Sequence, residues 1–158
     1  WVEGAIATML VSNGKAADCL AAHGAHAATD VTGFGLLGHL IEILNASQAR
    51  ARVDPALIPA LDGALALIAA GITSSLQPAN EAFSSALDGQ EIDDAGRRGL
   101  LFDPQTAGGL LASLPATRAD ACLAALQREG YGEAAIIGEV VGEVVEPVSG
   151  APLVEIRR

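Results

Sequence analysis

Residues 28–40 read ATDVTGFGLLGHL, and this stretch contains the clearest structural signals in the chain. It begins inside a short, Ala-rich strand that we predict over Ala25–Thr29, and Asp30–Gly35 follow as a loop that contains glycine. A helix comes next, because apolar residues recur there with the 3.6-residue period of a helix face. These residues are Leu36, Leu37, Leu40, Ile41 and Leu44. The stretch therefore predicts a strand, a tight loop and an amphipathic helix in direct succession.

On either side of this stretch, the chain is predicted to alternate helices and strands around one long polar segment. Helices are expected over residues 1–11, 15–22, 61–70 and 117–129, and strands over residues 49–53, 110–114, 135–145 and 153–156. Residues 73–99 form the polar segment, with a helical turn or two. The order strand, helix, strand, insertion, strand, helix, strand is a split βαβ pattern of the ferredoxin-like kind. We therefore expect an α/β (α+β) fold in one domain over residues 1–158, with a mixed sheet, extra helices and a final strand.

Composition limits the possible partners. The 158 residues are 51% apolar but only 3% aromatic, so the core must depend on Ala, Leu, Ile and Val. A chain this apolar is expected to expose surface that a covalent neighbour or a partner subunit covers. Nineteen acidic and nine basic residues give a net charge of −10. Nucleic acid is therefore not an expected partner, because phosphate binding needs clustered Lys and Arg. A nucleotide is compatible if a metal ion bridges acidic side chains to its phosphates.

The chain carries no signal for export or membrane insertion. Its longest apolar run, Gly63–Ile72, is too short to cross a bilayer, and no basic segment precedes an apolar stretch. Cys19 and Cys122 lie far apart and share no metal-ligand spacing, so we expect two buried thiols in a reducing compartment. These features predict a soluble, cytoplasmic domain. Because the chain begins at Trp1 directly in a helical pattern, we also expect it to be a piece of a longer polypeptide.

The three histidines are expected to have structural roles. His39 and Glu42 lie three residues apart on the predicted helix, off its apolar face, where they can pair with each other or with the preceding loop. They do not form a metal-binding motif. His23 and His26 flank the first strand, where surface or packing roles are expected.

The loop also contains the pattern Gly-x-Gly-x-x-Gly over Gly33–Gly38, which occurs in dinucleotide-binding folds. Asp54 follows about 20 residues later, where such folds place an acidic residue for the ribose. Two features argue against this interpretation. The preceding strand is rich in Ala rather than in Val and Ile, and Asp30–Thr32 separate it from the first glycine. Because no regular alternation of parallel strands follows Asp54, a dinucleotide-binding module is kept only as an alternative.

Asp30 is the candidate metal ligand of this loop. A carboxylate at the end of a strand, beside a glycine-rich turn, can reach Mg²⁺, which prefers one or two carboxylates together with phosphate oxygens. The competing interpretation makes Asp30 a cap that accepts hydrogen bonds from the amides of Thr32 or Gly33. Thr29 and Thr32 are either loop hydroxyls or phosphate contacts. Gly33 and Gly35 either let a ligand approach the backbone or supply a positive φ.

Residues 101–111 read LFDPQTAGGLL and form a second unusual segment. An Asp-Pro pair is typical of the start of a turn, and the Gly-Gly pair allows the chain to enter a sheet in close packing. Gln105 and Thr106 lie between apolar flanks. They are either groups that satisfy the turn or residues of a site, and spacing alone leaves both interpretations open.

Together, residues 28–40 and 101–111 resemble the two signature stretches in the second half of the selenophosphate synthetases (selenide, water dikinases). Their order and separation also fit this family, as does VEIR at residues 154–157. A small departure is Ala107, where Ser is more usual. The resemblance spans nearly the whole chain. It implies a partly ferredoxin-like C-terminal domain of the superfamily that includes aminoimidazole ribonucleotide synthetase, with an N-terminal ATP-binding and dimerisation domain missing here.

By this resemblance, the complete enzyme makes selenophosphate, AMP and phosphate from selenide, ATP and water, and it uses Mg²⁺. Asp30 is then the metal-binding Asp of the C-terminal domain, and the loop around it (Thr29, Thr32, Gly33 and Gly35) contacts the nucleotide. The nucleophile, a Cys or selenocysteine, is expected in the N-terminal domain, so no catalytic residue is assigned here. The expected partners are ATP, selenide, that domain and a second copy of the enzyme. The alternatives are another synthetase or phosphotransferase of the superfamily, the dinucleotide-binding module, and a structural docking domain.

Overall fold

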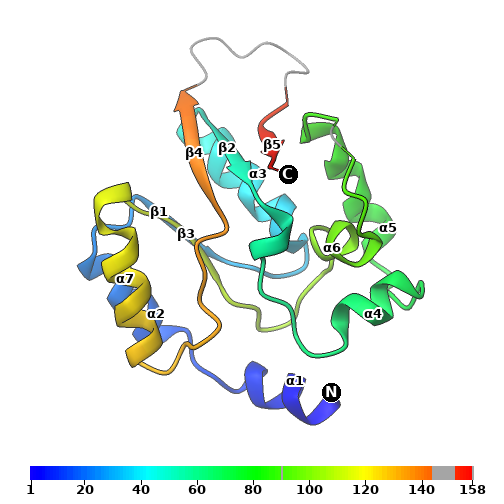
Figure 1. The fold of residues 1–158 in the computed structure, drawn as a ribbon, viewed down its shortest axis with the longest axis horizontal. Helices are drawn as coiled ribbons and strands as arrows, with labels where there is room; N and C mark the ends of the chain where they lie inside the picture. Colours follow the sequence, from blue (N-terminus) through cyan, green and yellow to red (C-terminus); the bar gives the residue numbers. More distant parts are fainter. Residues whose placement is uncertain (90, 144–151, 158) are drawn as a thin grey trace.

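The computed structural model describes residues 1–89, 91–143 and 152–157. The strands in this part of the chain are β1 (Ala27–Asp30), β2 (Ala49–Val53), β3 (Leu110–Ser113), β4 (Gly138–Glu143) and β5 (Val154–Ile156). The α-helices are α1 (Val2–Met9), α2 (Gly14–Ala22), α3 (Gly35–Ser47), α4 (Ala64–Ala69), α5 (Gln77–Asn80), α6 (Ala95–Leu100) and α7 (Ala116–Arg128). Two 3-10 helices are η1 (Pro55–Leu57) and η2 (Glu81–Ala86). Figure 1 shows their arrangement.

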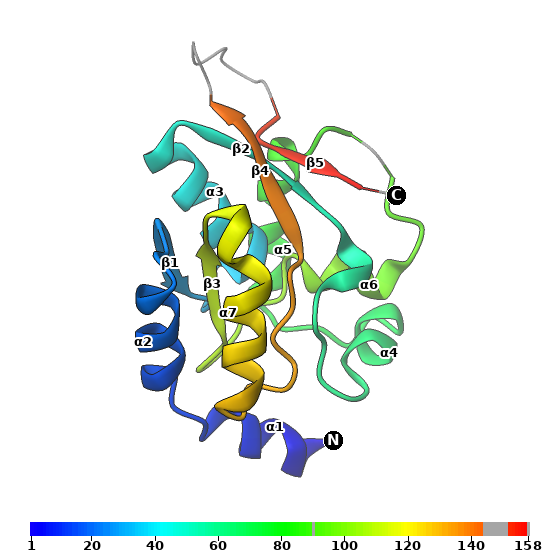
Figure 2. The same ribbon diagram turned by 60° about the vertical axis from the view of Figure 1, so that its left-hand side comes forward.

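The strands form two sheets (Figures 1 and 2). In the first sheet, β1 pairs antiparallel with β3, and Asp30 lies opposite Leu110. In the second sheet, β2 pairs antiparallel with β4 on one side and parallel with β5 on the other. The predicted α/β class, the mixed sheet and the order of strands along the chain are therefore confirmed, with the strands divided between two sheets. The predicted end of the fourth strand at Val145 lies outside the described residues.

Helix α3 connects the two sheets, because it contacts β1 and β3 of the first and β2 of the second. Its apolar face is the predicted one, and Leu37 and Leu44 on it are 1% and 2% exposed. Both belong to a core cluster that also contains the fully buried Phe102 and Val154. Burial of one large apolar side chain contributes about 1.5–3 kcal/mol. The helix predicted from residues 36–44 is therefore the central element of the fold.

The two unusual sequence segments meet in space, and we call the contact between residues 31–37 and 101–109 the loop junction. Three backbone hydrogen bonds cross it, from Leu37 N to Leu101 O (2.9 Å), from Gln105 N to Thr32 O (3.0 Å) and from Val31 N to Gly109 O (2.9 Å). Bonds of this kind satisfy polar groups that would otherwise be costly to bury. The two segments therefore form one structural unit, although they are far apart in the sequence.

Gly35 lies at the tightest point of the loop junction. Its φ of +69° is in the left-handed region, which favours glycine. A Cβ at this position would lie 2.9 Å from the carbonyl carbon of Phe102 and 3.0 Å from the carbonyl oxygen of Asp103. Gly33 differs, because its φ is not in that region and an added Cβ would meet nothing within 4 Å. The fold therefore requires glycine at position 35 but not at position 33.

The polar segment over residues 73–99 contributes to this junction. It contains the short helices α5, η2 and α6, in agreement with the predicted helical turns. Asn80 at the end of α5 is 5% exposed, and its Nδ2 donates to the carbonyl oxygens of Gly33 (2.9 Å) and Phe102 (3.0 Å). One side chain thus bridges both halves of the loop junction. The segment does more than cover the surface, because it holds the two loops together.

Apolar side chains are exposed on α1 and beside it, among them Trp1, Val2, Ile6 and Leu10. This agrees with the expectation that the chain has more apolar surface than it buries. No helix in the described part of the chain combines the length and the apolar character needed to cross a membrane.

We predict that Gly35→Ala destabilises the chain, whereas Gly33→Ala does not. A left-handed non-glycine residue costs about 1–3 kcal/mol, and the added methyl group also displaces the backbone at Phe102. The matched change at Gly33 enters open space, so its effect is expected to stay within about 0.5 kcal/mol. Urea unfolding followed by circular dichroism measures both free energies of unfolding. Equal effects of the two substitutions would show that the described junction is wrong.

Candidate functional site

The Asp30 carboxylate lies at the end of β1, where the chain enters the loop junction. Asp30 is exposed, and among the described residues its side chain makes no hydrogen bond or ion pair. The capping interpretation is not supported, because the turn is closed by a backbone bond from Gly35 N to Thr32 O (3.0 Å) instead. A carboxylate that the protein leaves without a partner is free to bind a cation.

The other residues of the predicted nucleotide loop divide into two groups. Gly33 is exposed and has open space around it, so a ligand can approach its backbone closely. Gly35 is buried and serves the fold, as described above. The Thr29 hydroxyl donates to its neighbour, the carbonyl oxygen of Asp30, at 3.3 Å. The Thr32 hydroxyl lies 3.1 Å from Nε2 of His39 and is therefore positioned by another side chain.

His39 supports the loop from α3. It is 7% exposed, with Nε2 beside the Thr32 hydroxyl and Nδ1 3.2 Å from Oε2 of Glu42. The Nδ1–Glu42 contact is close, but it lacks the alignment of a hydrogen bond. His39 thus pairs both with Glu42 and with the loop, which were the two possibilities predicted from its spacing. Its role is structural: it fixes the orientation of the Thr32 side chain.

Asp103 is a candidate that the sequence analysis did not single out. Its side chain is half-buried at the loop junction, and burial raises the pKa of the Asp103 carboxyl above its ordinary value. Among the described residues no cation or hydrogen-bond donor compensates this carboxylate. A buried charge without a partner costs stability, and such groups are frequent at functional sites. The signal in the sequence was the Asp-Pro pair, which we interpreted only as the start of a turn.

Gln105 and Thr106 fill the turn between Asp103 and β3. The backbone of Gln105 donates to Thr32 across the junction, which supports the turn role for this residue. Thr106 is exposed. Ala107, where the sequence departs from the usual Ser, has a positive φ of 52°. The structure thus places the Gln105 backbone in the turn and assigns no role to the side chains of Gln105 and Thr106.

The topology argues against the dinucleotide-binding alternative. Such a fold requires β1 and the strand after α3 to lie parallel in one sheet. Here β1 pairs antiparallel with β3, while β2 belongs to the other sheet. Asp54 does not have the ribose-binding context either, because its Oδ1 accepts a hydrogen bond from Ala56 N at 2.9 Å and caps η1. The Gly-x-Gly-x-x-Gly pattern is therefore coincidental.

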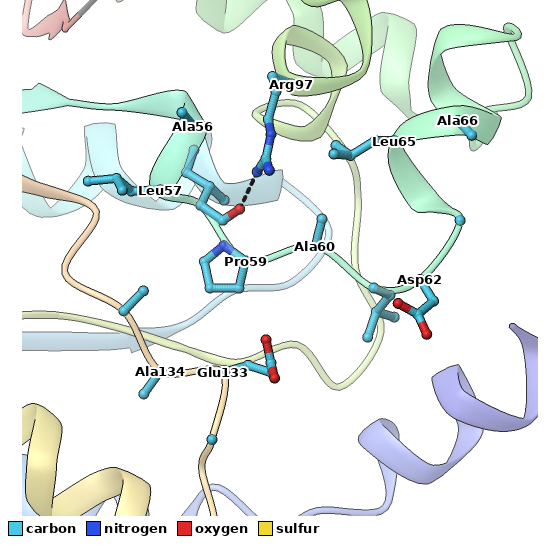
Figure 3. A pocket seen from close by; sticks show the side chains of 15 residues that line it. Ala56, Leu57, Pro59, Ala60, Asp62, Leu65, Ala66, Arg97, Glu133 and Ala134 are labelled. Atoms are coloured by element: carbon cyan, nitrogen blue, oxygen red, sulfur yellow. Dashed lines mark hydrogen bonds between the residues drawn. The ribbon is translucent and has the colours of Figure 1, made fainter.

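A separate hollow of about 650 Å³ lies beside η1 and α4 (Figure 3). Arg97 is the one cationic residue among those described in its lining, and its guanidinium donates to the carbonyl oxygen of Ile58. Asp62 and Glu133 add negative charge to the lining. The hollow contains none of the loop junction residues, and its single cation already has a partner. It is not a candidate phosphate site.

Comparison with known proteins agrees with these features. Residues 7–148 match the family model described as "AIR synthase related protein, C-terminal domain". The chain is 43% identical over 119 residues to a selenide, water dikinase of Paraburkholderia xenovorans (strain LB400), covering 75% of this chain and 34% of the relative. A selenide, water dikinase of Burkholderia orbicola (strain MC0-3) is 39% identical over 138 residues, which cover 86% of this chain and 39% of the relative. A selenide, water dikinase of Pelobacter propionicus (strain DSM 2379 / NBRC 103807 / OttBd1) is 37% identical over 147 residues, which cover 92% of this chain and 42% of the relative.

The chain therefore spans between 34% and 42% of the length of these three relatives, all named selenide, water dikinase. The family model covers most of the chain, and both unusual segments lie inside the matched range. The mixed α/β architecture with α3 between two sheets fits such a domain. From the match and the fold together, the chain belongs to the family of AIR synthase related proteins and corresponds to their C-terminal domain.

Proposed function

We propose that this chain is the C-terminal domain of a selenide, water dikinase, the enzyme that makes selenophosphate, AMP and phosphate from selenide, ATP and water. The observation that carries the proposal is the Asp30 carboxylate, exposed at the edge of an ordered loop and without a partner in the part of the chain that the structure describes. The similarity to three relatives of that name supports the choice of substrate. Asp30 is then the group through which this domain meets the nucleotide.

The charges around the loop junction favour a bridging metal ion. Residues 28–40 and 101–111 contain no Lys or Arg, so they offer no cationic side chain to a triphosphate. An Asp30 carboxylate beside phosphate oxygens would instead repel them. Mg²⁺ fits this arrangement, because it binds one or two carboxylates together with phosphate oxygens. When bound, it neutralises the negative charge of the phosphates during transfer.

The rest of the junction keeps Asp30 and its surroundings in place. Asn80 ties the carbonyl groups of Gly33 and Phe102 together, and His39 orients the Thr32 hydroxyl. Positioning of this kind lowers a reaction barrier because the enzyme need not reorganise when charge develops. Gly33 leaves the backbone open to a phosphate group. Asp103 is a second carboxylate of the same junction, available to the metal or to a bound water.

The remaining components of the reaction must come from elsewhere in the enzyme. We propose that an N-terminal domain supplies the Cys or selenocysteine nucleophile and most of the ATP-binding surface. We also propose that the complete enzyme acts as a homodimer in the cytoplasm. The exposed apolar side chains of α1 are consistent with a covalent neighbour. The other candidate, a different synthetase of the same family, differs in using a substrate other than selenide.

The chain by itself is expected to lack activity, because the proposed nucleophile and most of the ATP site lie outside it. Purified chain should form neither AMP nor selenophosphate from ATP and selenide, as measured by ³¹P NMR. The full-length enzyme serves as the positive control. Sustained product formation by the 158-residue chain would show that the nucleophile and the ATP site do not depend on another domain.

In the full-length enzyme, Asp30→Asn is expected to lower kcat at least 100-fold, because the amide carries no charge with which to hold Mg²⁺ beside the phosphates. Asp54→Asn is the matched control, since Asn also caps a helix and should leave both activity and folding intact. Circular dichroism checks that both variants fold. If Asp30→Asn retains near-normal turnover, Asp30 is not a metal ligand. If selenide gives no product with either the wild type or the control, the substrate assignment is wrong.

Asp103→Asn is expected to stabilise the chain at neutral pH while lowering the activity of the full-length enzyme. Burial raises the pKa of the Asp103 carboxyl, so the folded state binds a proton more tightly than the unfolded state. Stability from this group is therefore present at low pH and is lost as pH rises through the ordinary Asp range and up to the raised pKa. The stability gain of the variant should be absent near pH 3 and largest at pH 7, as urea unfolding at both pH values measures. A destabilised variant at pH 7 would mean that Asp103 has a partner.

A further inference from the structure

Three potential metal ligands meet between α2 and α7, on elements that the proposed phosphotransfer site does not use. Cys19 lies in the last turn of α2, His23 follows four residues later at the end of that helix, and Cys122 lies in α7. One ligand atom from each residue lies within 4.8 Å of the other two. Figures 1 and 2 both show α2 and α7 side by side. The sequence analysis expected two buried thiols with no shared metal-ligand spacing, whereas the structure buries only Cys122 and brings the two cysteines together.

The spacing of the ligand atoms suits one tetrahedral ion. Zn–S bonds of about 2.3 Å and Zn–N bonds of about 2.0 Å place neighbouring ligand atoms roughly 3.5–3.8 Å apart in a tetrahedron. Cys19 Sγ lies 3.7 Å from Nδ1 of His23, which is already in this range. The Cys122 sulfur lies within 4.8 Å of Cys19 Sγ and of a His23 ring nitrogen, so rotation of the side chains, without movement of the helices, can bring the three ligands to one ion.

The two helices hold these ligands in place before any ion binds. The Tyr131 hydroxyl, just after α7, donates to the carbonyl oxygen of Ser12 (2.7 Å) and accepts from the amide of Ala16 in α2 (3.2 Å). Lys15 and Glu129 form an ion pair at 3.4 Å between the same helices. Sites on packed helices are positioned more exactly than sites on loops. The cluster therefore requires little ordering on binding.

Burial and access are also suitable for a metal site. Cys122 is fully buried, whereas Cys19 and His23 are partly exposed, so an ion can enter from their side. Nδ1 of His23 lies 2.8 Å from the carbonyl oxygen of Cys19, so without an ion this nitrogen donates to the backbone. Coordination through Nδ1 therefore requires the ring to turn away from that carbonyl and to release the Nδ1 proton.

We propose that Cys19, His23 and Cys122 form a Zn²⁺ site that links α2 to α7 and leaves a fourth position open to solvent. Two thiolates and one imidazole select a borderline or soft ion such as Zn²⁺, whereas the oxygen ligands of the loop junction select hard Mg²⁺. The site is independent of the proposed phosphotransfer function. It requires that the two thiols release their protons to solvent as the ion binds.

A disulfide between Cys19 and Cys122 is the competing use of the same residues. One observation favours the metal: the third ligand, His23, has no part in a disulfide. Formation of a disulfide would also need an external oxidant.

The test is a titration of the reduced chain with Co²⁺, followed by displacement with Zn²⁺. Wild-type protein should bind one Co²⁺ per chain with the visible bands of a tetrahedral ion and the near-ultraviolet band of thiolate ligands, and Zn²⁺ should remove both. Cys19→Ser, His23→Gln and Cys122→Ala should each weaken binding at least tenfold. His26→Gln, which changes an exposed histidine near the cluster, is the matched control and should behave as wild type. Asp30→Asn should also leave the spectrum unchanged, which separates this site from the Mg²⁺ site.

Folding of each variant is checked by circular dichroism, because Cys122 is buried. His23→Gln changes a partly exposed residue, so it keeps the test informative if Cys122→Ala does not fold. Thermal unfolding gives a second readout: Zn²⁺ should raise the Tm of the wild type and of His26→Gln, but not that of His23→Gln. An octahedral Co²⁺ spectrum, or binding that survives all three ligand substitutions, would overturn the proposal. The proposal would also be overturned if the reduced protein bound no metal and if exposure to air lowered its mass by two hydrogens, which indicates a disulfide.

Discussion

The close approach of the Gly35 backbone to the backbone of Phe102 is the constraint on which the structure depends. It sets the angle at which the chain leaves β1 and enters α3, because only a left-handed residue without a Cβ fits there. Phe102 on the other side of the contact is fully buried. The helix that starts at Gly35 then packs against strands of both sheets. One backbone contact thus orients the core and the loop that carries Asp30.

The same contact explains how an acidic, apolar chain can hold an exposed carboxylate in an ordered loop. Asn80 and His39 bind the buried side of the loop, and Gly33, Phe34 and the Asp30 carboxylate face solvent. The protein holds this carboxylate in an ordered position without neutralising it. Asp103 is held at the same junction under a desolvation penalty. This penalty on Asp103 makes the junction less stable at neutral pH than it could be, which is typical of functional sites.

The chain thus offers two sets of candidate metal ligands with different chemistry. Carboxylate oxygens lie at the loop junction, and sulfur and imidazole ligands lie between α2 and α7. They belong to different parts of the fold, because the first depends on α3 and the core whereas the second depends on the packing of two outer helices. Hard and soft ions would therefore occupy separate places without competition.

Local patterns in the sequence determined the class of the fold, the course of α3, the order of the strands and the candidacy of Asp30. Each of these follows from residues close together in the chain, where spacing and turn chemistry act directly. Only the tertiary structure decided that the strands form two sheets and that Asn80 bridges the two loops. It also showed that the half-buried Asp103 carboxylate has no partner among the described residues and that Cys19 and Cys122 meet around His23. These features depend on contacts between residues far apart in the chain, for which one sequence contains no periodic signal.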